Sequence, residues 1–512
     1  MSTAVEDTDP KTPGNAEAMP AFRRWAILFC VTLATTQYAM SILVVAVLLP
    51  QMQGALSATQ DEIAWIMIFN ILATAVMTPT TGWLEGRFGH RRVMLVSMAG
   101  FSVATVACGM CTNLPLLVLF RIAQGAFGAP LIPLGQAIVL DTFPKRQHSL
   151  ATGVFGMAVV VGPVIGPMLG GSLAEMYGWP AAFYMFIPFG IIALVGMFLF
   201  LSDSRGQRQR VGLDWTGFLT LSVAVIGLQL LLSRGQRQDW FESPEIIIEA
   251  ALALVAFHLF VVHTLTVQRP FLNPRLMLNR NFVLGLIIVG IYGMLNFTPM
   301  VLMPPMLQGI LGYPDSIIGV LLGLRGAGAI AGFFVAIFVS RLDPRFGISL
   351  GYLIQVVSGI YMASFDINTT IFDVGVNSVL QGLAVGIIWV PLTVATFATL
   401  EPRYLAEGSA IYHLLRNLGS SIFISLSVTL VIVSTATNYA GMTEWISDYN
   451  KALALPWLLG AWSTDGVQGL AALSGEIGRQ AAMIGYINAF KAYALASFAV
   501  LPLILLVRMP KT

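Results

Sequence analysis

Charged and amide side chains interrupt several long apolar stretches of this chain, and these residues could do chemistry inside a membrane. They are Arg121, Gln124, Arg325, Arg416 and Asn417. A charge at the centre of a bilayer costs about 2.5 kcal/mol or more, so each arginine should face a protein interior or a water-filled cavity. We expect Arg121 to hold a substrate anion or to tune a neighbouring proton site. A structural arginine bonded to backbone carbonyls is the alternative.

Groups that could carry a proton are scarce in these stretches. A buried carboxylate suits that task because desolvation raises its pKa. In the first half of the chain the acids Glu85, Asp141 and Glu175 lie only at the ends of apolar stretches. The later titratable candidates are Glu407, His413 and Asp366. We take Glu407 as a transport and coupling residue, and a structural role is the alternative for each of the three.

A loop rich in glycine and charge follows the second apolar stretch and reads Gly82-Trp-Leu-Glu-Gly-Arg-Phe-Gly-His-Arg-Arg92. Its glycines allow a tight turn between two helices. Its charges can pair with helix ends and with Asp141, and the exchange of such pairs would close or open a gate. A basic loop that only sets the topology is the alternative. The gate residues that we expect are Glu85, Arg87, Arg91, Asp141, Asp343 and Arg345.

Glycines recur every four residues in the fifth apolar stretch, together with two prolines. The residues are Gly162, Pro163, Gly166, Pro167 and Gly170. Small residues at that spacing lie on one helical face and let helices approach closely. The prolines remove backbone donors and permit a kink. Tight packing with no bearing on the direction of transport is the alternative.

Aromatic and amide side chains of the apolar stretches are candidates for lining a central cavity. An apolar pocket with a few polar groups suits an amphipathic, aromatic solute. The alternative is that these side chains pack against neighbours or lipid. The candidates are Gln37, Tyr38, Asn70, Tyr292, Asn296, Phe297, Trp389 and Tyr412.

The elements that must position these residues are membrane-spanning helices. Of the 512 residues, 57% are hydrophobic and only 10% are charged, whereas soluble domains have roughly 25% charged residues. A span needs about 20 apolar residues, and the stretches reach that length without the alternation of an outer-membrane barrel. We predict an all-α polytopic membrane protein with spans near 25–49, 63–84, 93–112, 115–140, 149–175, 180–202, 214–233, 245–267, 281–309, 315–340, 348–366, 374–399, 404–434 and 486–508.

The order of these fourteen spans divides the chain into parts. We expect a cytoplasmic tail at 1–24 without a removable signal peptide, a six-helix bundle at 25–202, two accessory helices with their linkers at 203–280, and a second six-helix bundle at 281–508. An external loop at 435–485 would cover the external mouth or meet a partner, and a solvated surface loop is the alternative. One side of the predicted topology holds most of the 27 Lys and Arg. The positive-inside rule therefore places both termini in the cytoplasm.

The two six-helix parts echo each other at a nearly constant offset. The segment Leu84-Glu-Gly-Arg-Phe-Gly89 recurs as Leu342-Asp-Pro-Arg-Phe-Gly347, and Gln124-Gly125 recurs as Gln381-Gly382. Parallel repeats of six spans are a known architecture of membrane carriers, with the substrate site between the halves near the bilayer midplane. The repeat therefore favours a carrier, and chance similarity among apolar helices is the alternative.

These motifs together resemble those of the major facilitator superfamily, and in particular of its fourteen-span drug/H⁺ antiporters of the EmrB/QacA type. The loop at 82–92 resembles the superfamily's loop signature, Arg121-x-x-Gln124-Gly125 resembles its element in the fourth span, and 162–170 resembles the Gly-Pro signature of antiporters. The resemblance covers about residues 25 to 508. It implies an exporter in the inner membrane that binds a small-molecule substrate and exchanges it for protons. In Gram-negative relatives a periplasmic adaptor is a further partner.

The chain departs from the family pattern in its first span. Relatives usually carry an aspartate and an asparagine where this chain has Ser41 and Ala46. The aspartate is implicated in proton coupling in the family, and Ser41 cannot titrate. Either coupling has moved elsewhere or this protein is not a proton antiporter.

The leading interpretation is a secondary transporter that exports amphipathic small molecules by alternating access. An uptake carrier for an aromatic nutrient, such as a riboflavin-like vitamin, is the second interpretation, and the missing acid favours it. A lipid exporter is the third. The chain has no H-E-x-x-H and no Gly-Lys dipeptide, which are signatures of metalloproteases and P-loop ATPases. We therefore expect no enzymatic activity, cofactor, metal or nucleic-acid partner.

Overall fold

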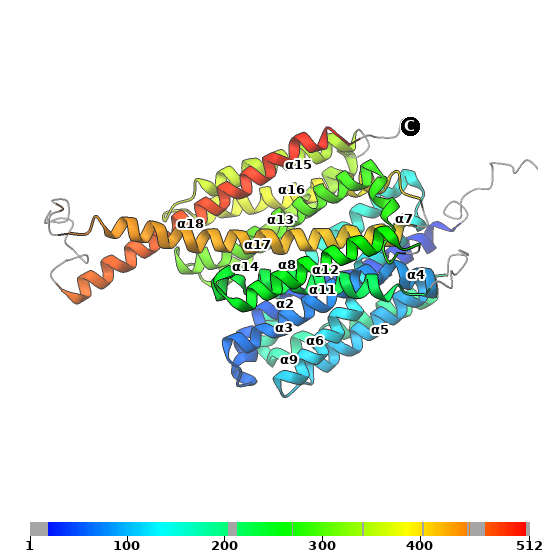
Figure 1. Ribbon diagram of the computed structural model, residues 1–512, viewed down its shortest axis with the longest axis horizontal. Coiled ribbons are helices and arrows are strands. Elements are labelled where there is room, and N and C mark those ends of the chain that lie inside the picture. The colour runs from blue at the N-terminus through cyan, green and yellow to red at the C-terminus, as the bar shows by residue number, and fades with distance from the viewer. Residues whose placement is uncertain are drawn as a thin grey trace, which may run out of the picture.

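The computed structural model describes residues 19–202, 212–268, 270–339, 343–401, 404–447, 450 and 466–507. Every regular element in this part of the chain is helical, and fourteen helical segments are long and apolar enough to cross a membrane. The helices run side by side along the long axis of an elongated bundle (Figure 1). The predicted all-α polytopic fold with fourteen spans is confirmed.

Six spans build the N-terminal half. Three are continuous helices: α2 (Ala21–Ala55), α5 (His90–Gly109) and α8 (His148–Tyr177). The other three spans are interrupted. The second span consists of α3 (Gln60–Met77), η1 (Thr78–Thr80) and α4 (Thr81–Phe88). The fourth consists of α6 (Leu114–Gly128) and α7 (Leu131–Thr142), and the sixth of α9 (Trp179–Tyr184) and α10 (Phe186–Phe200). Pro79 and Pro130 lie at the first two interruptions, where the missing N–H of proline breaks the helical hydrogen-bond ladder.

Six continuous helices build the C-terminal half: α13 (Arg280–Gly309), α14 (Asp315–Val339), α15 (Pro344–Ala363), α16 (Ile371–Phe397), α17 (Leu405–Thr443) and α18 (Val467–Ile504). The helices α14 and α16 pack closely because small residues face backbone. Gly328 and Gly332 of α14 lie directly against the backbone carbonyls of Val379 and Leu383 on α16, so neither position has room for a Cβ atom.

Two accessory helices, α11 (Trp215–Arg234) and α12 (Pro244–Thr266), lie between the halves in the sequence and form a hairpin. Arg234 joins them through ion pairs of 2.5 Å to Glu245 and 2.6 Å to Glu249. The helix α11 contacts α3 of the N-terminal half and α17 of the C-terminal half. Gln229 of α11 also donates a 3.0 Å hydrogen bond to Ser421 of α17. The accessory hairpin therefore touches both halves.

The helices α17 and α18 project beyond the rest of the bundle, at the left of Figure 1, as a helical arm. They contain 39 and 38 residues, so each is about 57 Å long, whereas a hydrocarbon core is about 30 Å thick. The loop predicted at 435–485 is therefore partly helical, because α17 continues to Thr443 and α18 begins at Val467. Hydropathy could not detect helix outside the apolar part. The charged positions Asp448, Lys451 and Asp465 lie outside the described residues.

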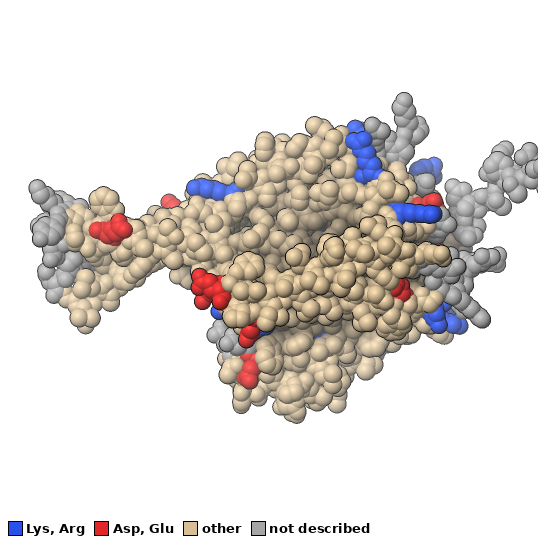
Figure 2. Space-filling model, viewed as in Figure 1, with Lys and Arg blue, Asp and Glu red and all other residues tan. Residues whose placement is uncertain are grey.

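Most of the Lys and Arg visible in Figure 2 gather at one end of the bundle, at the right, which we call the basic end. The two halves contact each other chiefly at this end and near the middle: α17 packs against η1, α4 and α7, and α8 packs against α14 and α16. Gly82 of α4 lies against the backbone of Glu407. In contrast, a Cβ atom on Gly319 or Gly323, nearer the other end of α14, would meet no described atom within 4 Å. The interface between the halves is closed at the basic end.

Candidate functional site

Arg121 is enclosed within the N-terminal half. Its side chain is 1% exposed, its Nε donates a 3.3 Å hydrogen bond to the carbonyl of Ile66, and its Nη1 donates to Gln124 Oε1. Gln124 donates in turn to Thr105 Oγ1 at 2.7 Å, and Asn70 donates to the Arg121 carbonyl at 2.8 Å. The structure thus brings Arg121 and Gln124 together, with Asn70 as an additional partner.

Arg325 is buried in a comparable way in the C-terminal half, on α14. Its Nη2 donates to both the backbone carbonyl and the side-chain oxygen of Asn296 on α13, the latter at 2.9 Å. Its Nε has no hydrogen-bond partner among the described residues. Asn296, predicted as a cavity residue, is therefore the neutral partner of a buried guanidinium.

Arg416 of α17 lies within an aromatic cluster near the contact between the halves. Its Cζ is 5.5 Å from the ring centroid of Trp389, and its guanidinium donates to Asn417 Oδ1 at 3.1 and 3.3 Å. The Trp389 ring lies 5.5 Å from that of Tyr292 and 6.1 Å from that of Tyr412. The cavity candidates Tyr292, Trp389 and Tyr412 therefore lie together. All three are at most 1% exposed, so they fill space in this conformation.

These arginines leave positive charge uncompensated. In the ranges that the structure describes, none of the three guanidiniums is paired with a carboxylate, and their partners are carbonyls, amides and an aromatic ring. Arginine does not lose its proton in proteins. Each such charge costs about 2.5–3.5 kcal/mol at the centre of a membrane span. An anion near these groups would therefore be stabilised.

The candidate Glu407 lies in the first turn of α17, at the basic end. Its Oε1 accepts a 2.5 Å hydrogen bond from the backbone N–H of Asn273, in the linker between α12 and α13. Asn273 Nδ2 also donates to the Tyr404 hydroxyl at 3.3 Å. Glu407 thus lies where the two halves and the linker meet. Its role in coupling stays a prediction.

The basic segment 82–92, predicted as a loop, is helical on both sides of Gly89 because α4 ends at Phe88 and α5 begins at His90. This segment is anchored to the end of the sixth span. Arg91 Nη2 donates a 2.8 Å hydrogen bond to the carbonyl of Phe198, and its guanidinium lies 5.2 Å from the centroid of the Phe198 ring. His90 Nε2 lies 2.8 Å from the carbonyl of Ser202. Arg87 lies 5.7 Å from the centroid of the neighbouring Trp83 ring. The contacts of His90 and Arg91 fix this segment against the end of the sixth span.

The other predicted gate residues lie at the ends of spans. Asp141 is exposed at the end of α7 and is close enough to Glu85 for their like charges to interact. Asp343 caps α15 by accepting a 2.9 Å hydrogen bond from the backbone N–H of Arg345. A gate that works by exchange of ion pairs stays a prediction.

The glycine stripe of the fifth span faces its own half of the molecule. Gly162, Pro163, Gly166, Pro167 and Gly170 all lie on α8, which continues through both prolines. A methyl group on Gly162 would lie 3.1 Å from the carbonyl oxygen of Thr36, and one on Gly166 would lie 2.8 Å from that of Met40. The stripe therefore packs α8 against α2, within the N-terminal half.

Two other glycines of α8 face the opposite half. Gly153 lies beside Ile337 of α14, and Gly156 lies so close to the indole of Trp389 that a Cβ atom would overlap it. The ring of Trp389 thus fills a gap left by a glycine on the other half. Sequence reasoning missed this contact, because nothing in the pattern separates these glycines from the stripe.

The remaining cavity candidates lie inside the N-terminal half. Tyr38 donates a 3.1 Å hydrogen bond from its hydroxyl to Thr74 Oγ1. Gln37 faces Gly190 of α10, where a Cβ atom would lie 3.5 Å from its Oε1. Both side chains are nearly fully buried. A substrate cavity lined by them stays a prediction.

One contact that the sequence does not reveal joins the two halves directly. His413 of α17 is buried, and its Nε2 hydrogen-bonds to Gln136 Oε1 of α7. The two residues are 277 positions apart, and no motif links them. The packing of α17 against α7 brings them together.

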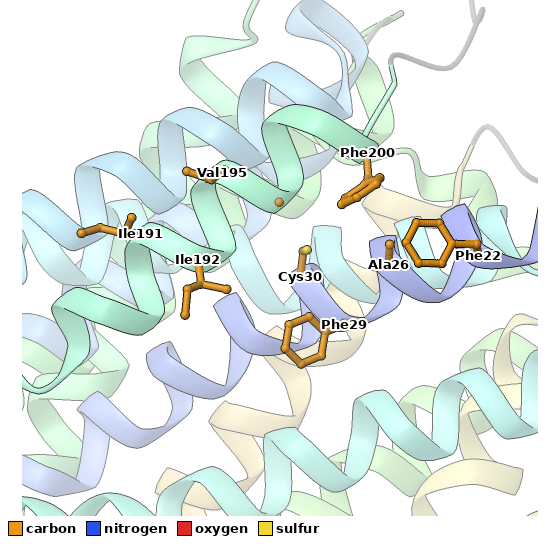
Figure 3. A pocket seen from close by; sticks show the side chains of 9 residues that line it. Phe22, Ala26, Phe29, Cys30, Ile191, Ile192, Val195 and Phe200 are labelled. Atoms are coloured by element: carbon orange, nitrogen blue, oxygen red, sulfur yellow. The ribbon is translucent and has the colours of Figure 1, made fainter.

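A separate apolar groove lies on the outer surface between α2 and α10 (Figure 3), with a volume of about 430 Å³. Phe22, Phe29 and Ile191 line it and are exposed. The described residues that line this groove carry no charge, so they offer nothing to orient a polar substrate. We do not include it in the candidate site.

Comparisons with known proteins agree with this architecture. The sequence model of the Major Facilitator Superfamily matches residues 27–424. The chain is 30% identical to the multidrug export protein EmrB of Escherichia coli (strain K12), over 82% of each chain. It is also 30% identical to the fatty acid resistance protein FarB of Neisseria gonorrhoeae, over 91% of this chain and 92% of that protein. The solved structure of the human organic anion transporter MFSD10 (TETRAN) matches with a TM-score of 0.57 at 15% identity, covering 94% of this chain and 100% of that chain, which supports the fold alone.

Proposed function

The chain belongs to the major facilitator superfamily, and from this premise we propose that it exports amphipathic small molecules across the inner membrane by alternating access. The observation that carries the proposal is the interface between the halves, which is closed at the basic end and holds the buried guanidinium of Arg416 among aromatic rings. Similarity to a multidrug export protein supports export. It does not favour uptake of an aromatic nutrient or lipid export.

The basic end faces the cytoplasm in this proposal. The positive-inside rule supports it, since Lys and Arg gather there (Figure 2). The structure then corresponds to a state closed toward the cytoplasm. A cysteine replacing Arg146 at the basic end should react with a membrane-impermeant maleimide only from the cytoplasmic side. One replacing Glu242, at the opposite end of the accessory hairpin, should react from the outside in intact cells, and the reverse result would invert the topology.

The three buried arginines favour substrates that carry negative charge. Arg416 is the residue placed to contact a substrate, because it lies nearest the meeting of the halves and beside aromatic rings. Arg121, held by Gln124, and Arg325 each supply a positive potential within their own half. We do not assign them to direct substrate contact, because neutral groups already accept hydrogen bonds from both guanidiniums. Asn417 orients Arg416 through its side-chain oxygen. Similarity to a fatty acid resistance protein supports this preference, because a fatty acid is an amphipathic anion at neutral pH.

Transport by purified protein in proteoliposomes tests this function. Decanesulfonate and decyltrimethylammonium form a matched pair of probes, because they share a chain length and carry permanent charges of opposite sign. We expect protein-dependent movement of decanesulfonate, accelerated by a pH gradient, and slower movement of the cation. A protein that moves neither probe would contradict the proposal, and preference for the cation would contradict its charge assignment.

The helical arm is a candidate surface for a partner outside the membrane. Near its tip, Trp445 is 73% exposed and Val467 is 85% exposed, and exposed apolar groups of this kind mark interaction sites when they cluster. We propose that the arm meets a periplasmic adaptor. Replacing Trp445 by Ser should then weaken drug resistance in cells while leaving transport in proteoliposomes unchanged, and loss of both would indicate a folding defect.

A further inference from the structure

In the contact between His413 and Gln136, one ring nitrogen of His413 remains able to accept a proton. An amide oxygen only accepts hydrogen bonds, so the Gln136 Oε1 partner assigns the hydrogen to His413 Nε2 and leaves Nδ1 as a bare nitrogen. This Nδ1 is buried and has no hydrogen-bond partner among the described residues. Histidine is the side chain whose charge changes near neutral pH. A group that titrates therefore joins the two halves.

Other polar atoms of this contact are also unsatisfied. The amide Nε2 of Gln136 and the indole Nε1 of Trp389 are buried without a partner in the part of the chain that the structure describes. The rings of Trp389 and His413 lie 5.9 Å apart. A buried polar group without a partner destabilises the state that buries it. The closed interface therefore carries the cost of burying these unpaired atoms.

The charge that faces His413 is positive. Arg416 lies three residues further along α17, on the same face of the helix. The His413 ring lies 5.9 Å from the ring centroid of Trp389, and the Arg416 Cζ lies 5.5 Å from it. The helices α8 and α16 present uncharged side chains here. The other titratable or charged groups around this region are Tyr412 on α17, Tyr292 on α13, Tyr38 on α2 and, toward the basic end, Glu407 on α17, Glu85 on α4 and Asp141 on α7.

We propose that His413 is the proton-binding residue of this transporter, and that its protonation opens the basic end. The inference rests on the proposed function. Nδ1 accepts a proton from a hydronium ion with its lone pair, which gives an imidazolium and leaves a water molecule, and no covalent bond between heavy atoms changes. The imidazolium adds a second positive charge beside Arg416 and a buried donor without an acceptor. The added charge and the unpaired donor each raise the free energy of the closed state. When the halves separate, water can hydrate the imidazolium, which removes these two costs.

This assignment accounts for the absence of an acid in the first span. Ser41, which stands where relatives carry an aspartate, donates its hydroxyl to the carbonyl of Tyr38 at 2.8 Å and cannot titrate. A proton that reaches His413 from outside would open the cytoplasmic side, where substrate enters. Loss of the proton to the cytoplasm would restore the closed state. Proton entry and substrate export are then coupled through one residue.

The distance between two spin labels at the basic end tests the proposal without any substrate. Ser149→Cys at the start of α8 and Ala398→Cys after α16 place one label on each half, in a background without the buried cysteines Cys30, Cys108 and Cys111. We expect the fraction of long distances to rise several-fold as the pH is lowered from about 8 to below about 6.5, the ordinary pKa of histidine. The variant His413→Gln should abolish this rise. His258→Gln, on the exposed face of α12, is the matched control and should keep it.

A second variant keeps the test decisive if His413→Gln folds poorly. Gln136→Glu is nearly isosteric and supplies a carboxylate to the imidazolium, so the closed state should persist at low pH, opposite to the wild-type response. A wild-type response in either His413→Gln or Gln136→Glu would overturn the proposal. Because no substrate is present, this result is independent of whether the alkyl probes are transported.

Discussion

The backbone N–H of Asn273 donates a 2.5 Å hydrogen bond to the carboxylate of Glu407. Asn273 lies in the linker that returns from the accessory helix α12 to α13, and Glu407 lies in the first turn of α17 beside Gly82 of α4. The accessory hairpin is thereby connected to the point where the two halves meet. This relation gives the hairpin a structural role at the basic end, in addition to its contacts with α3 and α17.

Removal of that single donor should weaken the closed state. Asn273 has φ −75° and ψ 111°, so Asn273→Pro matches these backbone angles while deleting the N–H. Loss of a hydrogen bond to a charged group should lower the free energy of unfolding by about 1.5–3 kcal/mol, measured by thermal unfolding in detergent. Asn273→Ala is the control, because it keeps the N–H and loses only the side-chain bonds. Equal effects of the two variants would show that the bond to Glu407 contributes nothing.

Arg416 should determine the preference for charge. Arg416→Gln removes the cation but can still hydrogen-bond Asn417, so we expect the KM for decanesulfonate to rise about tenfold, which corresponds to about 1.4 kcal/mol. Transport of decyltrimethylammonium should not fall. Arg416→Lys keeps the charge and should lose less. Equal losses for both probes would instead indicate that Arg416 is structural.

Gly156 should control closure of the basic end, because the Trp389 ring of the other half occupies the space that a Cβ atom needs. Gly156→Ala should therefore shift the label pair at positions 149 and 398 toward longer distances. Gly319→Ala is the matched control, since its added methyl group would have no described neighbour within 4 Å. This control should leave the label distances unchanged. It should raise the free energy of unfolding by about 1 kcal/mol, because alanine has a higher helix propensity than glycine. An unchanged distance in Gly156→Ala would show that the ring can move aside.

The sequence was sufficient to predict the spans and the buried arginines, but not the residues that hydrogen-bond to those arginines. Apolar length identifies a span, and a lone arginine within it must be buried in protein, so the burial of Arg121, Arg325 and Arg416 follows from composition. The partners of these residues depend on helix rotation, which hydropathy does not encode. The bond between His413 and Gln136 depends on how two whole halves dock. It could be found only from the structure.

The last prediction concerns Asp214, which lies just before α11 and outside the spans. Its carboxylate accepts hydrogen bonds from the backbone N–H of Gly217 and of Phe271, both at 3.0 Å, and lies 2.8 Å from His263 Nε2. Burial raises the pKa of Asp214, but these hydrogen bonds and the charge of His263 outweigh it and hold the pKa below its ordinary value. The carboxylate therefore joins the start of α11, the end of α12 and the following linker.

A depressed pKa in the folded state sets the sign of the pH dependence. The stabilising effect of Asp214 is present above its unfolded pKa of about 4 and is lost as the pH falls through the lower folded value. Asp214→Asn should lower the free energy of unfolding by about 1–2 kcal/mol above about pH 5, and the difference from wild type should shrink below about pH 4. Asp239→Asn is the control, because Asp239 is exposed and asparagine tolerates its left-handed φ of 52°. A difference that stays constant down to about pH 3 would mean that the charge of Asp214 is not what stabilises this junction.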